Sequence, residues 1–319
     1  MMRKNNMRQT SQHIMQKLCV LVLLGMAVCQ MTAQQDPMFT QYMFNTLSIN
    51  PAYAGSADRL SAVALHRSQW VNFEGAPTTQ TVTVHSPLKK ENISLGGSII
   101  NDAYGPVKQI GFYLDASYRI FFGENRLAFG LKAGTNMFSA NLIDLNPLMP
   151  NDNAFAANIS SKALPNFGFG AMYYSKRFYL GASAPKLLAN KLIDGDLPDF
   201  LNNQERQHIF LIAGAVFDIS YYTKFKPTLL VKAVNGAPIA AEVTAQFLFF
   251  EKFWAGAMYR WEDAAGILLQ YEINNRFKIG YAYDYTLSDI RKYSDGSHEI
   301  MLGFDLIRGY GGDVSPRYF

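Results

Sequence analysis

The residues best suited to chemistry are charged side chains that share one face of alternating segments. Paired carboxylates among them could act as general acid and base. Their signs are mixed, however, and isolated charges are costly in a narrow, poorly hydrated interior. We therefore interpret the set as an interior network of ions that neutralise one another, and not as a catalytic centre. Its members are Asp115, Arg119, Lys132, Asp218, Lys232, Glu242, Arg260, Glu272, Lys278, Asp284, Glu299 and Asp305.

The histidines and hydroxyl groups indicate no second kind of site. Beyond the leader segment described below, the histidines lie far apart and lack the spacing and cysteine companions of a metal site: His66, His85, His208 and His298. Ser294 and Asp295 stand near His298, but they belong to a loop, and nothing supplies an oxyanion hole. Phosphate-loop, nucleophile-elbow and HExxH motifs are absent from the sequence. We therefore predict no enzyme activity, no metal site and no cofactor.

Strands must position the charged residues, because apolar and polar side chains alternate with a period of two. The clearest region runs from Ala264 to Phe304. Near the middle of its strands, the apolar positions Leu269, Ile279 and Leu302 are predicted to point outward, and Gln270, Lys278 and Gly303 inward. The charged residues of this region share the inward face.

Alternation of this kind fits a soluble sandwich or a barrel in a membrane. Aromatic residues near strand ends, such as Tyr271 and Tyr281, and glycine with isolated charges on the opposite face favour the barrel. We predict an all-β fold, a transmembrane antiparallel β-barrel of about 14 strands with an irregular N-terminal segment. The expected strands are 60–70, 78–86, 93–100, 110–120, 127–134, 166–175, 178–184, 207–219, 228–234, 240–250, 253–261, 265–273, 277–285 and 298–304.

Connection lengths predict how the barrel is oriented. The longest links, 141–165, 185–206 and 286–296, each follow an odd-numbered strand, whereas links after even-numbered strands, such as 123–125 and 274–276, are short. Bacterial barrels have short periplasmic turns and longer loops outside the cell. The first strand is therefore expected to rise from the periplasm.

Residues 1–33 are typical of a cleaved secretory signal, with basic residues and no acid, an apolar run to Val28 and a small residue at Ala33. Cys29 raises the alternative of a lipoprotein, but Val28 stands where that processing signal needs a small residue. No later segment offers the ~18 uninterrupted apolar residues of a transmembrane helix. Without the leader, Lys+Arg falls from 29 to 25, equal to the 25 of Asp+Glu. A neutral chain gives no support for a nucleic-acid partner.

Residues 34–59 are expected to form an irregular segment ahead of the barrel at 60–319. The segment does not alternate, and asparagine and proline punctuate its large apolar side chains. Its prominent residues are Met38, Phe39, Tyr42, Phe44, Asn50, Pro51 and Tyr53. So many apolar groups must be buried against something. The segment is either a plug within the barrel or a docking element for a periplasmic partner, and both hypotheses could hold together.

Motifs spread over nearly the whole chain resemble the PorP/SprF family. They are Asp36-Pro37 with Gln41-Tyr42, and the blocks 50–55, 75–81, 279–285 and 296–303. The resemblance implies a non-enzymatic outer-membrane component of the type IX secretion system and the associated gliding machinery of Bacteroidota. It implies outer-membrane lipid around the barrel and a peptidoglycan-binding lipoprotein or motor-ring proteins in the periplasm. It also implies a cargo or adhesin with a C-terminal sorting domain at the surface.

The main hypothesis is therefore an interaction protein that attaches cargo or adhesin at the surface and links it to periplasmic machinery. The alternative is a passive outer-membrane channel or a transporter of hydrophobic compounds. An outer-membrane enzyme is a third hypothesis, which has no catalytic constellation to support it. The lumen distinguishes the first two hypotheses, because a diffusion channel conducts ions and a filled barrel does not.

Overall fold

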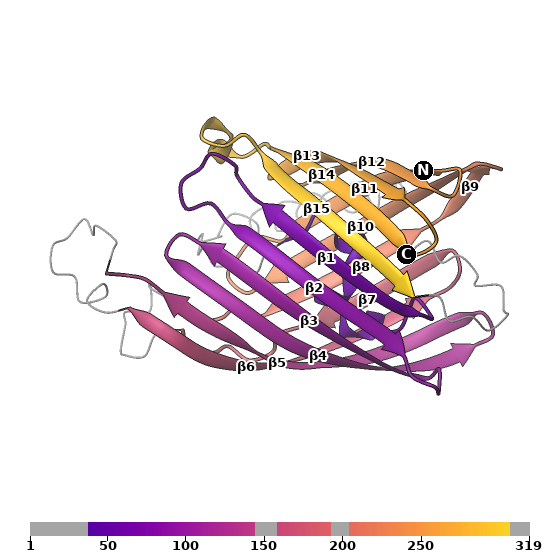
Figure 1. Cartoon of the computed structure of the whole chain (residues 1–319), viewed down its shortest axis with the longest axis horizontal. Helices are drawn as coiled ribbons and strands as arrows, with labels where there is room; N and C mark the ends of the chain where they lie inside the picture. Colours follow the sequence, from indigo (N-terminus) through magenta and orange to yellow (C-terminus); the bar gives the residue numbers. More distant parts are fainter. Residues whose placement is uncertain (1–37, 144–157, 193–203, 307–319) are drawn as a thin grey trace, which may run out of the picture.

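The computed structural model describes residues 38–143, 158–192 and 204–306. The expected leader and parts of two expected loops lie outside these ranges. Strands make up most of the described chain (Figure 1). They are β1 (Leu60–Ser68), β2 (Thr78–Pro87), β3 (Ile93–Tyr104), β4 (Val107–Phe122), β5 (Asn125–Ala140), β6 (Ile159–Tyr174), β7 (Phe178–Ala184), β8 (His208–Ala215), β9 (Phe217–Ser220), β10 (Thr223–Val234), β11 (Ala240–Phe249), β12 (Phe253–Arg260), β13 (Ala264–Glu272), β14 (Phe277–Thr286) and β15 (Ser297–Leu306). Among the described residues, none belongs to a helix with the length and apolar character needed to cross a membrane.

The strands form one antiparallel sheet that closes on itself. Neighbours along the chain pair with each other, and β15 pairs with β1 to complete the ring. β8 and β9 act as one wall strand interrupted at Val216, because both pair with β10. The result is a closed 14-strand antiparallel barrel, which confirms the predicted fold class.

The interruption at Val216 corrects the expected position of Asp218, which we predicted to lie in the interior. β7 begins at Phe178, opposite Ala215, so Asp218 lies beyond the last residue that β7 pairs. Its carboxylate is exposed at the end of the barrel and pairs with Arg177 at 2.6 Å and Lys224 at 3.2 Å. Alternation gave the correct side of the strand, but β7, the neighbouring strand that would enclose Asp218, does not extend that far.

Side chains alternate between the two faces of the wall as the sequence predicts. On β4 and β5, Leu114 and Leu131 point outward and are 74% and 65% exposed. Their neighbours Asp115 and Lys132 are only 2% and 3% exposed. Exposed apolar residues outside and buried charges inside are the reverse of a water-soluble protein. The outward face is therefore the membrane-facing wall.

The two ends of the barrel differ. The links 69–77, 141–158, 185–207 and 287–296 leave the wall at one end, called here the long-loop end. The links 88–92, 123–124, 175–177, 250–252 and 273–276 lie at the other, the short-turn end. The short links 105–106 and 261–263 are exceptions at the long-loop end. β6 projects beyond β7 there (Figure 1), because β7 pairs β6 only from Phe169 to Tyr174.

Leu269 tests the assignment of the outward face. It is 38% exposed near the middle of β13. Arginine at this position would place a charge in hydrocarbon, so Leu269→Arg should destabilise the barrel by ~2 to 4 kcal/mol. The same change at Ile273, just beyond the short-turn end of β13, should cost only ~0 to 1 kcal/mol. Equal losses at the two positions, measured by reversible folding into lipid bilayers, would contradict the placement of the wall.

Candidate functional site: the plugged lumen

Residues 38–59, called here the plug, lie inside the barrel. Tyr42 is 1% exposed and Asn50 is fully buried. The backbone forms the short 3₁₀ turns η1 (Tyr42–Phe44), η2 (Thr46–Ser48) and η3 (Pro51–Tyr53). Asn50 begins the last turn, because its side chain accepts a hydrogen bond from the N–H of Ala52 at 2.9 Å and Pro51 needs no partner for an N–H. Asparagine and proline thus build a compact coil where a strand would otherwise form.

The plug is anchored near the long-loop end to two carboxylates of the wall. The backbone N–H groups of Thr40 and Gln41 donate to Glu299 at 2.9 and 2.8 Å. The Thr40 hydroxyl donates to Asp284 at 2.6 Å. Arg67 donates to the Thr40 hydroxyl at 2.9 Å and pairs with Asp284 at 2.8 Å and Glu299 at 3.2 Å. Charge-assisted hydrogen bonds of this kind are strong, so plug and wall share one buried ion network.

A second arginine extends this network along the wall. Arg260 donates to Glu242 from Nε at 2.9 Å and from its terminal nitrogen at 2.6 Å. It also lies 3.0 Å from Asp263 and 3.8 Å from Asp284. The sheet brings the pair together, because Glu242 on β11 stands opposite Arg260 on β12. The interior charges of β11, β12, β14 and β15 are thereby joined into one group.

Asp115 and Lys132 form a separate buried pair. Their side chains on β4 and β5 lie opposite each other and approach to 2.9 Å. The Lys132 ammonium also donates to the carbonyl of Leu47 in the plug at 3.3 Å. Lys232, on β10, is likewise buried at 1% exposure. The interior charges thus divide into distinct groups. The pair of Asp115 and Lys132 also holds the plug, through the carbonyl of Leu47.

The remaining expected charges lie toward the short-turn end. Arg119 pairs with Asp58, at the end of the plug, at 2.7 Å. Lys278 pairs with Asp305 at 3.1 Å. Glu272 stands opposite Lys278 but is partly exposed. Among the described residues, Lys278 pairs with Asp305, and no residue forms an ion pair with Glu272. Glu272 therefore lies at the margin of the lumen.

Sequence reasoning missed Arg67 and Lys226, which both point into the lumen. On the inward face of β1, Arg67 follows the apolar Val63 and Leu65, so the residues before it did not indicate a charged face. Lys226 precedes the expected strand 228–234, whereas β10 begins at Thr223. Strict alternation, continued beyond the apolar residues, was the signal that could have found both.

Polar groups of the wall also form hydrogen bonds with the middle of the plug. Asn45 donates to the Thr81 hydroxyl at 2.9 Å and accepts from the Thr83 hydroxyl at 2.8 Å. The Asn50 amide donates to the carbonyl of Ala171 at 3.2 Å. The asparagines therefore fasten the plug to β2 and β6, on different sides of the barrel.

Two glycines of the wall make room for the plug. A Cβ atom added at Gly130 would lie 2.2 Å from the backbone nitrogen of Ala52. One added at Gly170 would lie 2.1 Å from the side-chain oxygen of Asn50. Carbon atoms do not approach other atoms so closely, so the plug lies directly against the wall backbone at these points.

The tyrosines of the plug contact different walls. The Tyr42 hydroxyl donates to Thr228 on β10 at 2.9 Å. The Tyr53 ring packs edge-on against His85 on β2, with 5.4 Å between ring centroids. The plug therefore contacts opposite sides of the lumen.

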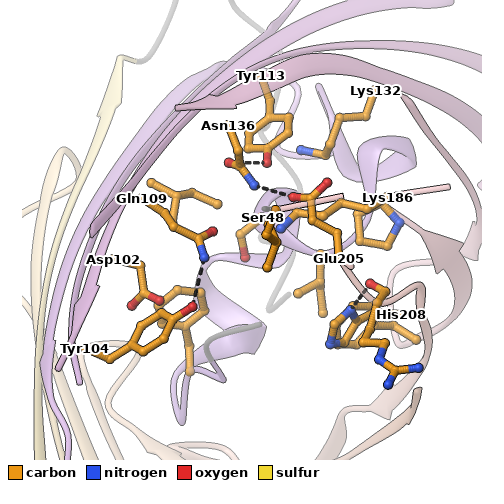
Figure 2. A pocket seen from close by; sticks show the side chains of 17 residues that line it. Ser48, Asp102, Tyr104, Gln109, Tyr113, Lys132, Asn136, Lys186, Glu205 and His208 are labelled. Atoms are coloured by element: carbon orange, nitrogen blue, oxygen red, sulfur yellow. Dashed lines mark hydrogen bonds between the residues drawn. The ribbon is translucent and has the colours of Figure 1, made fainter. Parts of the chain in front are cut away.

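A cavity of about 80 Å³ lies beside the plug at the long-loop end (Figure 2). Phe39 lines it from the plug, and Met38 packs on the same apolar cluster as Phe39. In Figure 2 the Tyr113 hydroxyl donates to Asn136 at 2.7 Å, and the Asn136 amide donates to Glu205 at 2.9 Å. Glu205 belongs to the link between β7 and β8, so plug, wall and link meet at this cavity.

The histidines lie at separate places in the fold. His85 accepts a hydrogen bond at Nδ1 from the N–H of Gly55 at 3.1 Å. Nδ1 of His298 is hydrogen-bonded to the Tyr281 hydroxyl at 2.7 Å, whereas Ser294 accepts from the N–H of Gly296 in its own loop. Within the described ranges, no three His, Cys, Asp or Glu side chains form a group that could hold a metal.

Gly170→Ala tests the close seat of the plug. The added methyl group would overlap Asn50, so we expect a loss of about 1 to 3 kcal/mol in the free energy of unfolding, as for overpacked cores. Gly97→Ala is the matched control, because its Cβ would lie at an ordinary 3.5 Å from the carbonyl oxygen of Tyr113. Equal unfolding free energies for the two variants in bilayers would contradict this contact.

Among solved structures, the chain is similar to an outer membrane protein, to a porin and to CdiB. Omp33 of Acinetobacter baumannii is 8% identical, with 78% of this chain and 100% of that chain covered and a TM-score of 0.47. A KdgM porin is 9% identical, with coverages of 77% and 99% and a TM-score of 0.37. CdiB from Acinetobacter baumannii is 8% identical, with coverages of 78% and 60% and a TM-score of 0.39.

The family comparison covers most of the chain. Curated protein sequences give no match. A family model described as type IX secretion system membrane protein PorP/SprF matches residues 31–304, which include the plug and almost the whole barrel. Together with the closed barrel and its apolar outer wall, this match identifies an outer-membrane β-barrel. The chain belongs to the PorP/SprF family of type IX secretion system membrane proteins.

Proposed function

We propose that this protein is a closed, non-enzymatic barrel that attaches cargo or an adhesin at the cell surface and links it to periplasmic machinery. The plug carries the proposal, because it is held to the wall from one end of the lumen to the other. Gln41 contacts Glu299 near the long-loop end, and Asp58 pairs with Arg126 at 2.6 Å at the short-turn end. A barrel filled in this way suits interaction better than diffusion.

The two ends are proposed to face different compartments, with long loops outside the cell and short turns in the periplasm. The plug then runs from the outer mouth, near Thr40, to the periplasmic rim, near Asp58. Tyr42 and Pro51, considered above for docking, are buried inside the barrel and act as plug residues in this conformation. Asp58 is exposed where the plug joins β1, and it is the part of the plug that a periplasmic partner would meet.

The partners are proposed from the family resemblance. They are outer-membrane lipid around the wall, a peptidoglycan-binding lipoprotein or motor-ring proteins at the short-turn end, and cargo or adhesin with a C-terminal sorting domain at the long-loop end. Affinity purification of the full chain from native outer membranes, with mass spectrometry of the proteins that co-purify, tests this assignment. Recovery of the barrel without any secretion component or surface protein would overturn it.

Deletion of Met38–Tyr53 separates this function from that of a passive channel. We expect the full-length protein to be silent in planar lipid bilayers and the deleted barrel to conduct, because the interior loses its filling. Heat-modifiable migration on gels verifies that the deleted barrel is folded. If the full-length protein conducts as well as the deleted one, the passive channel is the better hypothesis.

Single cysteines test the proposed orientation, since both natural cysteines lie in the expected leader. We expect cysteines at Asn72 and Asp295, at the long-loop end, to react with a membrane-impermeant maleimide on intact cells. Cysteines at Asn125 and Asn275, at the short-turn end, should react only after lysis. The reverse pattern would invert the barrel and exchange the proposed partner sites.

A further inference from the structure

The wall of β10 to β13 presents polar side chains to the lumen at several levels between the two ends, beside the apolar Leu230, Met258 and Leu268, which pack in one cluster with the plug. Beginning at the long-loop end, these side chains are Glu242 with Arg260, Thr228 with Thr244, Lys226 with Gln246, and then Gln270. At the exposed short-turn end, Lys224 pairs with Asp218. Together they form a polar column along one side of the plug. Water-filled barrels have polar linings of this kind.

Several groups of this column are buried without a hydrogen-bond partner among the described residues. They are Lys226 Nζ, Glu242 Oε1, Gln246 Oε1 and Gln270 Oε1, joined by Gln41 Oε1 from the plug. The residues concerned are at most 3% exposed. Polar groups are rarely buried unpaired, and a cluster of them points to a functional role. Other buried groups without a hydrogen-bond partner lie elsewhere, such as the hydroxyls of Ser94 and Ser98 on β3, whereas Thr81 and Thr83 on β2 are satisfied by Asn45.

Lys226 is the clearest of these groups. Its ammonium lies 5.1 Å from the ring centroid of Phe44 in the plug and 5.3 Å from that of Trp254 on β12, and no carboxylate pairs with it in the described chain. Aromatic faces attract a cation but do not replace water or a carboxylate. The two rings meet edge-on, 6.5 Å apart, and close the column beside the lysine.

The plug is tethered mainly to other walls. Thr40 and Gln41 hold it to β14 and β15, and Asn45 and Asn50 hold it to β2 and β6. Toward the β10 to β13 wall, the contacts are largely packing, apart from the hydrogen bonds that Tyr42 donates to Thr228 and that the Gln246 amide donates to the Met43 sulfur at 3.9 Å. Phe44 is only partly buried, unlike its neighbours in the plug. The Phe44 ring can therefore move while the tethers remain in place.

We propose that the seam between the plug and the β10 to β13 wall is a gated passage for small hydrated anions, with Phe44 as its gate. When the Phe44 ring leaves Trp254, water reaches Lys226, Gln246 and Gln270 and satisfies their unpaired groups. Lys226 then sets the preference for anions, because the charges above and below it in the column are paired. The passage is closed in this conformation and does not depend on the attachment of cargo.

Conductance of the purified full-length Phe44→Ala protein in planar bilayers tests the gate. We expect stepwise opening in potassium chloride that the wild-type protein lacks. Tyr53→Ala is the matched control, because it removes an equally large plug ring that packs on β2, and it should stay silent. Trp254→Leu opens the same gate from the wall side and serves if Phe44→Ala does not fold. Silence of the folded gate variants, or equal conductance in Tyr53→Ala or the wild type, overturns the proposal.

Reversal potentials under a potassium chloride gradient test the role of Lys226. The Phe44→Ala passage should prefer chloride. Adding Lys226→Gln should abolish the preference, and adding Lys226→Glu should reverse it toward potassium. A selectivity that does not change with residue 226 would show that the current passes elsewhere in the lumen, and would overturn the proposed route.

Discussion

A closed wall of 14 strands encloses more space than its inward side chains can fill, so the lumen must hold water or another part of the chain. In this protein residues 38–59 occupy it, and they bring backbone N–H and C=O groups that need partners away from water. Glu299 meets this need for Thr40 and Gln41, and Lys132 does so for the carbonyl of Leu47. The interior ions therefore bind the plug as well as one another.

The anchor of the plug coincides with the place where the barrel closes. Arg67 lies on β1, and Glu299 stands opposite it on β15, in the pairing that completes the ring. The same two side chains bind Thr40. Seating of the plug and closure of the wall thus depend on one buried group, because an arginine or carboxylate left without its partner in this interior is costly.

The plug is held more closely on one side of the lumen than on the other, and this difference is the basis of the proposed gate. Gly130 and Gly170 let the plug touch the wall backbone, and Asn50 is fastened there. Across the lumen, Lys226 and Gln246 keep unpaired groups behind Phe44. A segment held by many hydrogen bonds on one side and by few on the other can open a path without leaving the barrel.

The sequence by itself determined which way the strand residues face, because alternation over many strands places Leu269 on one face and Gln270 on the other whatever their neighbours are. Aromatic residues near strand ends then favoured a membrane barrel over a soluble sandwich. It also determined that the segment around Asn50 and Pro51 could not join the sheet. Only the tertiary structure decided where that segment lies and in which direction it runs. Its anchor joins Thr40 to Glu299, 259 residues further along the chain. Local periodicity reports which face a side chain takes, and it holds no record of partners so distant in sequence.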